Sequence, residues 1–364
     1  MSKVALTGGR GFLGWHTRAA LYEQGIEADL IPVGGAFDPV QAKQAINGAE
    51  RLIHIAGINR AEDDEIREGN IRFAKQVTDS INRADVPPGV VVYANSTQAG
   101  NGSAYGDAKH SAGEILREAA EKAGSHFVEV KLPNLFGEHG RPFYNAVTAT
   151  FCHLLVEGSE PTVENDKELT LLHSQDAADL LIGNCGVEEQ RQREQQETVS
   201  GLLKRLQEFD TIYRRGEIPD ISEPFSRNLF NTYRSHMFLA SPELPLVKHA
   251  DNRGSFTEII RTYGGTGQTS FSTTVPGVLR GGHYHRRKVE RFLVLSGKAR
   301  ISLRKMFTDE ILNFDVTGDE PVAIDMPTMW THSIENTGSE ILLTNFWTDD
   351  HFDPNNPDTI VEAV

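Results

Sequence analysis

The feature that most constrains the fold of this chain is a glycine-rich turn near its N-terminus. Residues 7–14 read Thr-Gly-Gly-Arg-Gly-Phe-Leu-Gly, directly after a short apolar run and before a helical pattern. Gly8, Gly11 and Gly14 provide the tight turn, the close backbone approach and the close helix–strand packing that a pyrophosphate group requires at a helix N-terminus. Because the turn lies between a strand and a helix, the spacing predicts a dinucleotide-binding loop.

The first half of the chain alternates apolar runs with helical patterns. Continuous apolar runs, typical of strands buried on both faces, lie at 4–7, 51–56, 90–94 and 127–132. Helical patterns lie between them, at 11–24, 66–84 and 105–122. This alternation predicts right-handed βαβ units and an α/β, doubly wound parallel sheet of the Rossmann type. The stretch 188–197, nearly all Glu, Gln and Arg, predicts a solvated helix face or an excursion loop.

The last third of the chain has a different pattern of apolar and polar residues. Short alternating segments recur there, separated by Gly, Pro and Asp: 255–261, 269–274, 290–295, 299–305, 311–316, 322–326 and 341–347. Such a pattern predicts an all-β jelly roll or small barrel. Prolines at 219, 224, 242 and 245 mark the transition. We therefore expect two domains, 1–243 and 244–364.

The charge and composition exclude several classes of protein. The net charge is −15 and neither half of the chain is basic, which argues against a nucleic-acid partner or an anionic membrane surface. No apolar run approaches the roughly 18 residues of a membrane span. The N-terminus lacks a signal-peptide pattern. Two cysteines without CxxC spacing exclude a disulfide scaffold, so we expect a cytoplasmic protein.

Three polar residues of the first half suit the reduction of a ketone. Tyr105 and Lys109 are four residues apart and therefore share one helix face. A tyrosine hydroxyl, with an ordinary pKa of about 10, is a weak acid, and a neighbouring ammonium group stabilises its phenolate. Ser96 closes a predicted strand and could hold the carbonyl oxygen. The three residues predict a proton-transfer site for an alkoxide that develops during reduction.

The glycine turn and these three residues resemble the short-chain dehydrogenase/reductase superfamily, extended type. The resemblance implies that Ala56 and Gly57 end the fourth strand, that Ser96 closes the fifth, and that Pro133 and Asn134 follow the sixth. It implies the following cofactor contacts: Gly8, Arg10, Gly11, Phe12, Leu13, Gly14, Ala56, Gly57, Lys109 and Pro133.

The cofactor predicted from the sequence is NADPH rather than NADH. An acidic residue after the second strand usually selects NAD, but residues 31–35 read Ile-Pro-Val-Gly-Gly. Arg10, inside the glycine turn, could instead meet a 2′-phosphate, although a solvated loop residue is the plain alternative.

Three histidines and a glutamate form a second constellation, in the β half. The residues follow the patterns HxHxxxxE and PxxxxHxxxN, and the expected ligands are His283, His285, Glu290 and His332. Alternation along a strand would place His283 and His285 on one face. Three imidazoles and one carboxylate suit Zn²⁺ and also accept Mn, Fe or Ni.

These two patterns resemble both motifs of the cupin family, with Met329 at a position where the second motif usually has glycine. Residues 278–284 and 251–258 also resemble segments of the nucleotide-sugar 3,5-epimerases, which abstract a proton beside a ketone. The second resemblance implies a catalytic histidine at His283 and substrate contacts from Arg253 and Arg280. His283 therefore has two rival roles, ligand and base.

The whole chain resembles the bifunctional reductase/epimerases of bacterial capsule and O-antigen synthesis. The resemblance rests on the reductase–cupin pairing, on Asn59-Arg60, and on segments 142–145 and 352–358, and it is poorest over 188–220. It implies C3 epimerisation of a UDP-2-acetamido-2,6-dideoxy-4-hexulose in the cupin, then reduction of its C4 ketone with NADPH, towards UDP-N-acetyl-L-fucosamine. It also implies a homodimer and the following substrate contacts: Asn59, Arg60, Asn134, Arg141, Arg253 and Arg280.

Two alternatives stay open at this point. One is a single-function nucleotide-sugar enzyme whose cupin only binds or dimerises. The other is a non-catalytic nucleotide-sugar sensor, which the intact Ser96, Tyr105 and Lys109 disfavour, because a sensor does not need a proton-transfer site.

Overall fold

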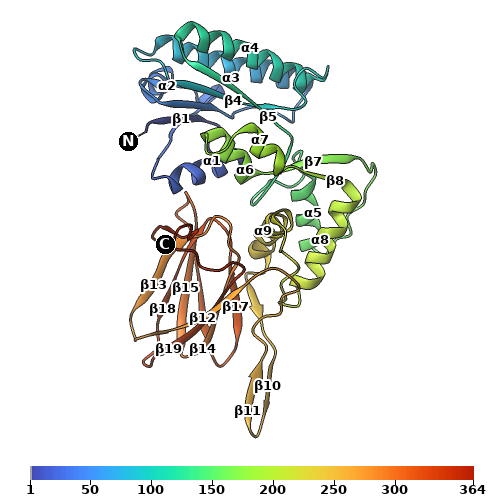
Figure 1. Cartoon of the computed structure of the whole chain (residues 1–364), viewed down its shortest axis with the longest axis vertical. Coiled ribbons are helices and arrows are strands. Elements are labelled where there is room, and N and C mark those ends of the chain that lie inside the picture. The colour runs from blue at the N-terminus through green and yellow to red at the C-terminus, as the bar shows by residue number, and fades with distance from the viewer. Residues whose placement is uncertain (1) are drawn as a thin grey trace. The chain divides into compact units, whose positions relative to one another are not determined.

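A computed structural model describes residues 2–364 (Figure 1). The chain divides into two compact units. The first comprises the chain up to Phe136 together with Gly140–Val147 and Lys167–Thr198. The second comprises Gly137–His139, Thr148–Asp166 and Val199–Val364. The boundary expected at 243/244 remains a prediction about which segments fold on their own.

The first unit contains a five-stranded parallel sheet in the order β2-β1-β3-β4-β5. Its strands are β1 (Val4–Thr7), β2 (Asp29–Ile31), β3 (Arg51–His54), β4 (Val90–Ser96) and β5 (His126–Leu132). Apolar side chains fill both faces of the sheet, as the continuous apolar runs require. The expected doubly wound α/β fold is confirmed.

Helices cover the two faces of this sheet (Figure 1). On one face lie α1 (Phe12–Glu23) and α6 (Ser174–Ile182). On the other face lie α2 (Pro39–Ile46), α3 (Asp63–Arg83) and α4 (Ala104–Ala123). The connection between α2 and β3 is short. Because β1, β3 and β4 run parallel, their carboxyl ends lie at one edge of the sheet.

The strand count expected from the sequence is wrong by one. Ala56 and Gly57, expected at the end of a fourth strand, follow β3; Ser96, expected to close a fifth, ends β4; and Pro133, expected after a sixth, follows β5. Between Ile31 and Arg51 the chain forms only the short 3-10 helix η1 (Gly34–Ala36) and α2. A further parallel strand would need a second crossover of about a dozen residues, and η1 and α2 already occupy this stretch with the first.

A small three-stranded sheet completes the first unit. It consists of β6 (Asn134–Phe136), β7 (Glu168–His173) and β8 (Gln195–Thr198). The Glu/Gln/Arg-rich stretch forms α7 (Val187–Gln192) and then β8, which pairs antiparallel with β7. The solvated helix was expected and the strand was not, because β8 is specified by the free edge of β7 rather than by an apolar alternation of its own.

The second unit contains two five-stranded antiparallel sheets, β12-β19-β14-β17-β9 and β16-β15-β18-β13-β20, and a hairpin β10-β11. The first sheet and the hairpin consist of β9 (Glu243–Pro245), β10 (Lys248–Asp251), β11 (Gly254–Thr257), β12 (Gln268–Thr274), β14 (Glu290–Ser296), β17 (Val322–Met326) and β19 (Leu342–Thr348). The second sheet consists of β13 (Leu279–Tyr284), β15 (Lys298–Lys305), β16 (Ile311–Thr317), β18 (Trp330–Asn336) and β20 (Ile360–Val361).

An apolar core fills the space between these two sheets, with Phe292, Ile301, Leu303 and Ile324 fully buried or nearly so. This is the jelly-roll architecture expected of a cupin. Three helices that precede residue 244 also belong largely to this unit: α5 (Val147–Val156), α8 (Val199–Tyr213) and α9 (Pro224–Ala240).

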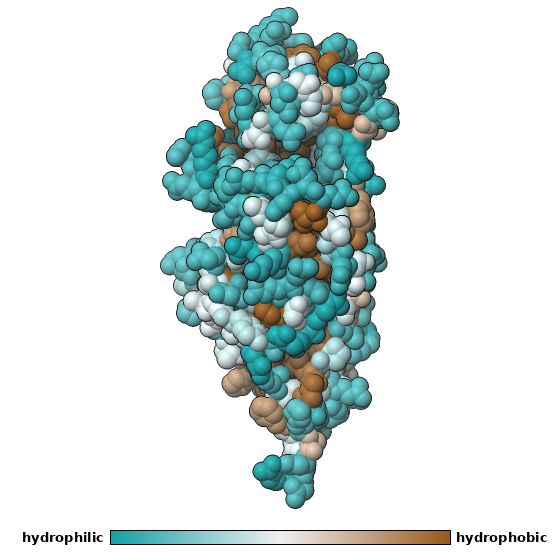
Figure 2. Space-filling view, turned by 90° about the vertical axis from the view of Figure 1, so that its right-hand side faces the viewer, coloured by the Kyte–Doolittle hydropathy of each residue, from teal (hydrophilic) through white to brown (hydrophobic). Residues whose placement is uncertain are grey.

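The surface is mostly polar, as the charged composition suggests. The face in Figure 2 is largely hydrophilic, and its hydrophobic side chains lie in small separate groups. Over residues 2–364, no helix is both long enough and apolar enough to traverse a membrane.

Candidate functional site

The glycine turn between β1 and α1 has a backbone that only glycine permits. Gly8 has a φ of +72°, and a Cβ there would lie 2.7 Å from the amide nitrogen of Ala56. A Cβ on Gly14 would lie 2.0 Å from the carbonyl oxygen of Gly8. Helix α1 begins after Gly11, which offers no side-chain cap, so the first amides of the helix are available to an anion.

The end of β3 is tied to this turn by one hydroxyl group. Thr7 Oγ1 lies 2.7 Å from Nδ1 of His54 and accepts the amide hydrogens of Ile55 and Ala56 at 3.2 and 3.3 Å. A Cβ on Gly57 would lie 2.8 Å from Oδ1 of Asn70. The backbone of Ala56 and Gly57 is therefore held beside the turn, as expected for a strand end that lines a dinucleotide.

Two arginines bring positive charge to the glycine turn. Arg10 is exposed, and Arg18 on α1 is half-buried beside Gly9. Burial lowers the pKa of Arg18, and the nearby charge of Arg10 lowers it further, against an opposing effect of Glu27. The glycine turn thus has two guanidinium groups near it, whose positive charge favours a phosphate anion there.

Helix α4 carries both members of the Tyr–Lys pair. Its N-cap Ser103 accepts the amide hydrogen of Gly106 at 3.0 Å, and Gly124, with a φ of +76°, ends the helix. Burial raises the pKa of Tyr105, and its side-chain interaction with Ser96 partly offsets that rise. Ser96 is the last residue of β4. The structure therefore brings Ser96 and Tyr105 together as predicted.

Lys109 lies inside the first unit rather than on its surface. Its ammonium group donates to the carbonyl oxygen of Ala94 at 2.7 Å and lies 4.2 Å from the ring centroid of Tyr93. Burial lowers the pKa of Lys109 to about 7, and the carboxylate of Glu129 opposes that shift. A lysine with such a pKa can change its protonation near neutral pH.

Three of the predicted substrate residues of the first unit, Asn59, Arg60 and Arg141, meet in one loop cluster, and Asn134 lies apart from it. Arg60 donates to the carbonyl oxygen of Phe143, and Asn145 Nδ2 donates to the carbonyl oxygen of Asn59 at 2.5 Å. Segments 59–60 and 143–145, distant in sequence, are thereby joined. The guanidinium of Arg141 contacts this cluster, 5.0 Å from the ring centroid of Tyr144. Asn134 lies apart from it, and its Nδ2 donates to the carbonyl oxygen of Thr170 at 3.2 Å.

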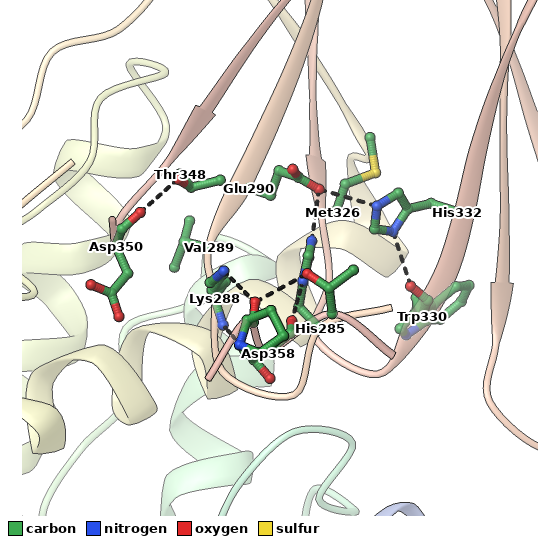
Figure 3. A network of polar contacts seen from close by, with 12 residues as sticks. His285, Lys288, Val289, Glu290, Met326, Trp330, His332, Thr348, Asp350 and Asp358 are labelled. Atoms are coloured by element: carbon green, nitrogen blue, oxygen red, sulfur yellow. Dashed lines mark hydrogen bonds and ion pairs between the residues drawn. The ribbon is translucent and has the colours of Figure 1, made fainter. Parts of the chain in front are cut away.

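The four predicted metal ligands converge in the second unit. The ligand atoms of His283, His285, Glu290 and His332 all lie within 4.8 Å of one another. In Figure 3 the side chains of His285, Glu290 and His332 point towards one another. His283 lies on β13, His285 follows β13, Glu290 begins β14, and His332 lies on β18. His285 lies one residue beyond β13, and the ring centroids of His283 and His285 lie 5.1 Å apart, so the two histidines lie on one face as alternation predicts.

The protonation of this cluster suits a cation. His285 Nδ1 lies 2.5 Å from the carbonyl oxygen of Asp358, and His332 Nδ1 lies 3.2 Å from that of Trp330. A carbonyl oxygen only accepts, so each Nδ1 carries a hydrogen and each Nε2 is the ring nitrogen that faces the cluster. These Nε2 atoms lie 3.0 and 3.1 Å from Oε2 of Glu290. Acceptors facing one another this closely require a proton or a metal ion between them.

Burial and the charges of neighbouring side chains shift the pKa values of the residues in this cluster. Burial opposes ionisation of Glu290, but His285 and His332 outweigh it and hold the pKa of this carboxyl well below its usual value. Burial lowers the pKa of His283 to about 4, and the other two histidines contribute. The neutral imidazole of His283 is therefore free to act as ligand or as base. Tetrahedral ligands about 2.1 Å from zinc lie about 3.4 Å apart, and the ligand-atom separations of the cluster, 3.0 and 3.1 Å for two pairs and at most 4.8 Å overall, bracket that value.

Two further arginines predicted from the sequence lie outside this cluster. Arg253 occupies the tip of the β10-β11 hairpin, is exposed, and pairs with Asp251 at 2.6 Å. Figure 1 shows this hairpin extending away from the two sheets of the unit. Arg280 lies on β13, three residues before His283, and is exposed.

Comparison with known proteins identifies the family. Residues 4–183 match the NAD dependent epimerase/dehydratase family, and residues 249–360 match the polysaccharide biosynthesis C-terminal domain. The chain is 32% identical over 373 residues to the UDP-2-acetamido-2,6-beta-L-arabino-hexul-4-ose reductase of Pseudomonas aeruginosa, covering 100% of this chain and 99% of that protein. The chain belongs to the family of this reductase.

Two other proteins resemble this member of the reductase family. The crystal structure of CapF, the capsular polysaccharide assembling protein of Staphylococcus aureus, is 32% identical, covers both chains fully and has a TM-score of 0.62. The spore coat polysaccharide biosynthesis protein SpsL of Bacillus subtilis is 28% identical over 122 residues, which cover 31% of this chain and 81% of SpsL.

The structure of this reductase-family chain also contains site residues that sequence reasoning missed. Arg18 joins Arg10 at the turn, Glu129 lies near Lys109, and Asp358 holds His285. Arg18 could have been found from its position on the face of α1 that follows the turn. Asp358 ends the segment 352–358 that carried part of the resemblance, but no sequence pattern assigned it a role. Glu129 carries no sequence signal, because it approaches Lys109 from a different strand.

Proposed function

We propose that the chain reduces the C4 ketone of a UDP-2-acetamido-2,6-dideoxy-4-hexulose with NADPH, after C3 epimerisation at the histidine cluster. The product would be a precursor of UDP-N-acetyl-L-fucosamine for a surface polysaccharide. The observation that carries this proposal is the gathering of Ser96 and Tyr105, with a buried Lys109, in a chain related over its full length to a hexul-4-ose reductase.

The first unit would carry out the reduction. When bound, NADPH supplies the hydride. The Ser96 hydroxyl holds the carbonyl oxygen, and Tyr105 donates its proton to that oxygen as the alkoxide develops. The ammonium group of Lys109 favours the phenolate that Tyr105 leaves behind, which lowers the barrier to proton transfer. Arg10 and Arg18 support the choice of NADPH, because paired guanidinium groups bind the 2′-phosphate that NADH lacks.

The histidine cluster would carry out the epimerisation. A ketone at C4 acidifies the hydrogen at C3, and a divalent metal, with Zn²⁺ the best match to the donor set, polarises the carbonyl oxygen when bound. His285, Glu290 and His332 would hold that ion. His283, neutral near pH 7, would either complete the ligand set or remove the C3 hydrogen. Reduction afterwards removes the ketone and therefore prevents reversal of the epimerisation.

The deciding experiment is NMR of the product formed from the 4-keto UDP-sugar in D₂O, with and without NADPH. Deuterium at C3 without NADPH, and a reduced C4 centre only with it, is the expected result. Reduction without any C3 exchange would favour a single-function reductase whose second unit only binds the nucleotide sugar or forms a dimer contact. If neither C3 exchange nor C4 reduction is detected, the result would favour a non-catalytic nucleotide-sugar sensor.

The two roles of His283 separate in a variant of that residue. In His283→Ala, loss of C3 exchange with full metal content would assign His283 as the base. Loss of the metal itself would assign it as a ligand. His285→Ala should lose metal in either case, because removing one ligand weakens a site severely.

We also propose that the chain forms a homodimer in the cytoplasm. Large apolar side chains are exposed along the β unit, with Phe256 67% and Phe271 72% accessible. Contact with a second copy of the chain would remove exposed aromatic side chains such as these from water. Sedimentation of the wild-type chain and of Phe271→Asp tests the proposal: a monomeric wild type refutes it. The unpaired Cys152 and Cys185 suit a reducing compartment.

A further inference from the structure

The last residues of the chain pack against the histidine cluster. Strand β20 pairs with β13, so that Val361 lies opposite His283 and Ile360 opposite Tyr284. The carbonyl oxygen of Glu362 accepts the hydroxyl hydrogen of Thr331, the neighbour of His332. The segment 357–363 thus touches the strands that carry two of the four expected ligands. We call this segment the C-terminal strap.

Asp358 is the residue of the strap that holds the loop between β13 and β14. Its two carboxylate oxygens accept the amide hydrogens of Arg286, Arg287 and Lys288 at 3.0, 2.9 and 2.9 Å. Three consecutive amides on one carboxylate fix the path of the loop that separates His285 from Glu290. Asp358 itself is buried, with 7% of its surface accessible. Figure 3 shows it directly beside His285 and Lys288.

The same residue also holds the imidazole ring of His285. The main-chain carbonyl oxygen of Asp358 lies 2.5 Å from Nδ1 of His285 and accepts its hydrogen. This contact keeps the lone pair of Nε2 directed at the cluster, where Nε2 lies 3.0 Å from Glu290. The carbonyl can reach the ring because Asp358 has a φ of +43°, a left-handed conformation that aspartate and asparagine tolerate better than most residues.

We propose that Asp358 is the positioning residue of the metal site. Its carboxylate fixes the loop, its carbonyl fixes the tautomer and orientation of His285, and the metal affinity of the cluster depends on both. The inference rests on the proposed metal site and extends it to a residue that binds no metal. Partners that hold a ligating imidazole in this way typically change metal affinity by about 10- to 100-fold when they are removed.

The test measures Zn²⁺ affinity by competition with a chromophoric chelator, using the full-length chain. Asp358→Ala removes the carboxylate and disfavours the left-handed backbone, and we expect Zn²⁺ affinity to fall by about 10- to 100-fold. Asp358→Asn retains the backbone preference but loses the charge and one acceptor, so we expect a smaller loss in the same direction. With Co²⁺ in place of Zn²⁺, the visible absorption of both variants should shift, because the geometry of the nitrogen ligand changes.

The matched control is Glu362→Gln. It removes an ion pair with Arg304, at 2.5 Å, from the same strap without touching His285 or its loop. We expect its Zn²⁺ affinity to stay within about twofold of the wild type, since a partly exposed pair contributes little. A purely structural strap would instead lower the melting temperature of the metal-free chain equally in all three variants and leave the Co²⁺ spectrum unchanged.

Two results would overturn the inference, and they are distinguishable. If the wild-type chain binds no Zn²⁺ or Co²⁺, the proposed metal site and this inference fall together. If the wild type binds and Asp358→Asn, folded by circular dichroism, binds Zn²⁺ equally tightly with the same Co²⁺ spectrum, only the role of Asp358 falls. Should Asp358→Ala not fold, the outcome with Asp358→Asn decides.

Discussion

Replacing Asp325 by asparagine should destabilise the second unit far more than the same replacement at an exposed aspartate. Asp325 lies on β17 and is 3% accessible. Its carboxylate accepts hydrogen bonds from Nε and Nη2 of Arg291, at 2.6 and 2.9 Å, and from the hydroxyl of Tyr213 at 2.8 Å. Arg291 is 1% accessible, so water cannot solvate its charge when the carboxylate is removed.

The expected magnitude follows from these contacts. Asparagine keeps the shape of the side chain and one acceptor for Tyr213 but removes the negative charge. The bond from Nε of Arg291 is lost, and the bond from Nη2 is no longer charge-assisted; at about 1.5–3 kcal/mol for each charge-assisted bond, the loss is at most about 6 kcal/mol. Breaking a buried pair by removing one partner costs about 3–5 kcal/mol, which agrees. We therefore expect a loss of about 4 kcal/mol in the free energy of unfolding.

The assay is urea unfolding of the wild type and two asparagine variants. Asp315→Asn is the control, because Asp315 forms a similar 2.9 Å pair with Arg300 but in solvent, and its loss should leave stability nearly unchanged. The double change Asp325→Leu with Arg291→Met should recover much of the loss, since apolar replacement of a whole buried pair is often neutral. Stability of Asp325→Asn within about 1 kcal/mol of the wild type would refute the reasoning.

The same pair predicts a pH dependence with a definite sign. Burial opposes ionisation of Asp325, but Arg291 outweighs it and holds the pKa of this carboxyl below its usual value. A carboxyl with a depressed folded pKa contributes its full stability above its unfolded pKa of about 3.9 and loses it as the pH falls through the folded value. The stability difference between the wild type and Asp325→Asn should therefore be constant near neutral pH and shrink in acid.

Three further predictions concern the first unit. Tyr105→Phe should bind NADPH nearly as the wild type does by fluorescence titration, yet lose about 10²–10⁴ in turnover, and wild-type turnover would remove Tyr105 from the mechanism. Arg10→Ala should weaken NADPH more than NADH, and an equal loss for both would show that Arg10 does not contact the 2′-phosphate. Because Glu129 opposes the lowering of the Lys109 pKa by burial, Glu129→Gln should move the alkaline limb of the kcat/KM profile to lower pH. Glu114→Gln, which removes another carboxylate paired with Arg117 on α4, should not move it, and identical limbs in both variants would refute the role of Glu129.

Much of the fold could be predicted from local sequence patterns. The glycine turn at 7–14, the continuous apolar strands and the later alternating segments each reflect an interaction between neighbours in the chain. The Tyr105–Lys109 pair follows from helical spacing in the same way. The four metal-ligand candidates were also recognisable, because a carboxylate and three imidazoles seldom occur in that order without a common site.

Other features were decided only by the tertiary structure. The strand order of the parallel sheet, the pairing of β8 with β7, and the bulge of β13 between Gly281 and His283 depend on which edges meet in space. Asp358 reaches His285 across 73 residues of sequence. Hydrogen bonds between distant segments leave no periodic trace in the sequence, because each needs only one residue placed by the packing of all the rest.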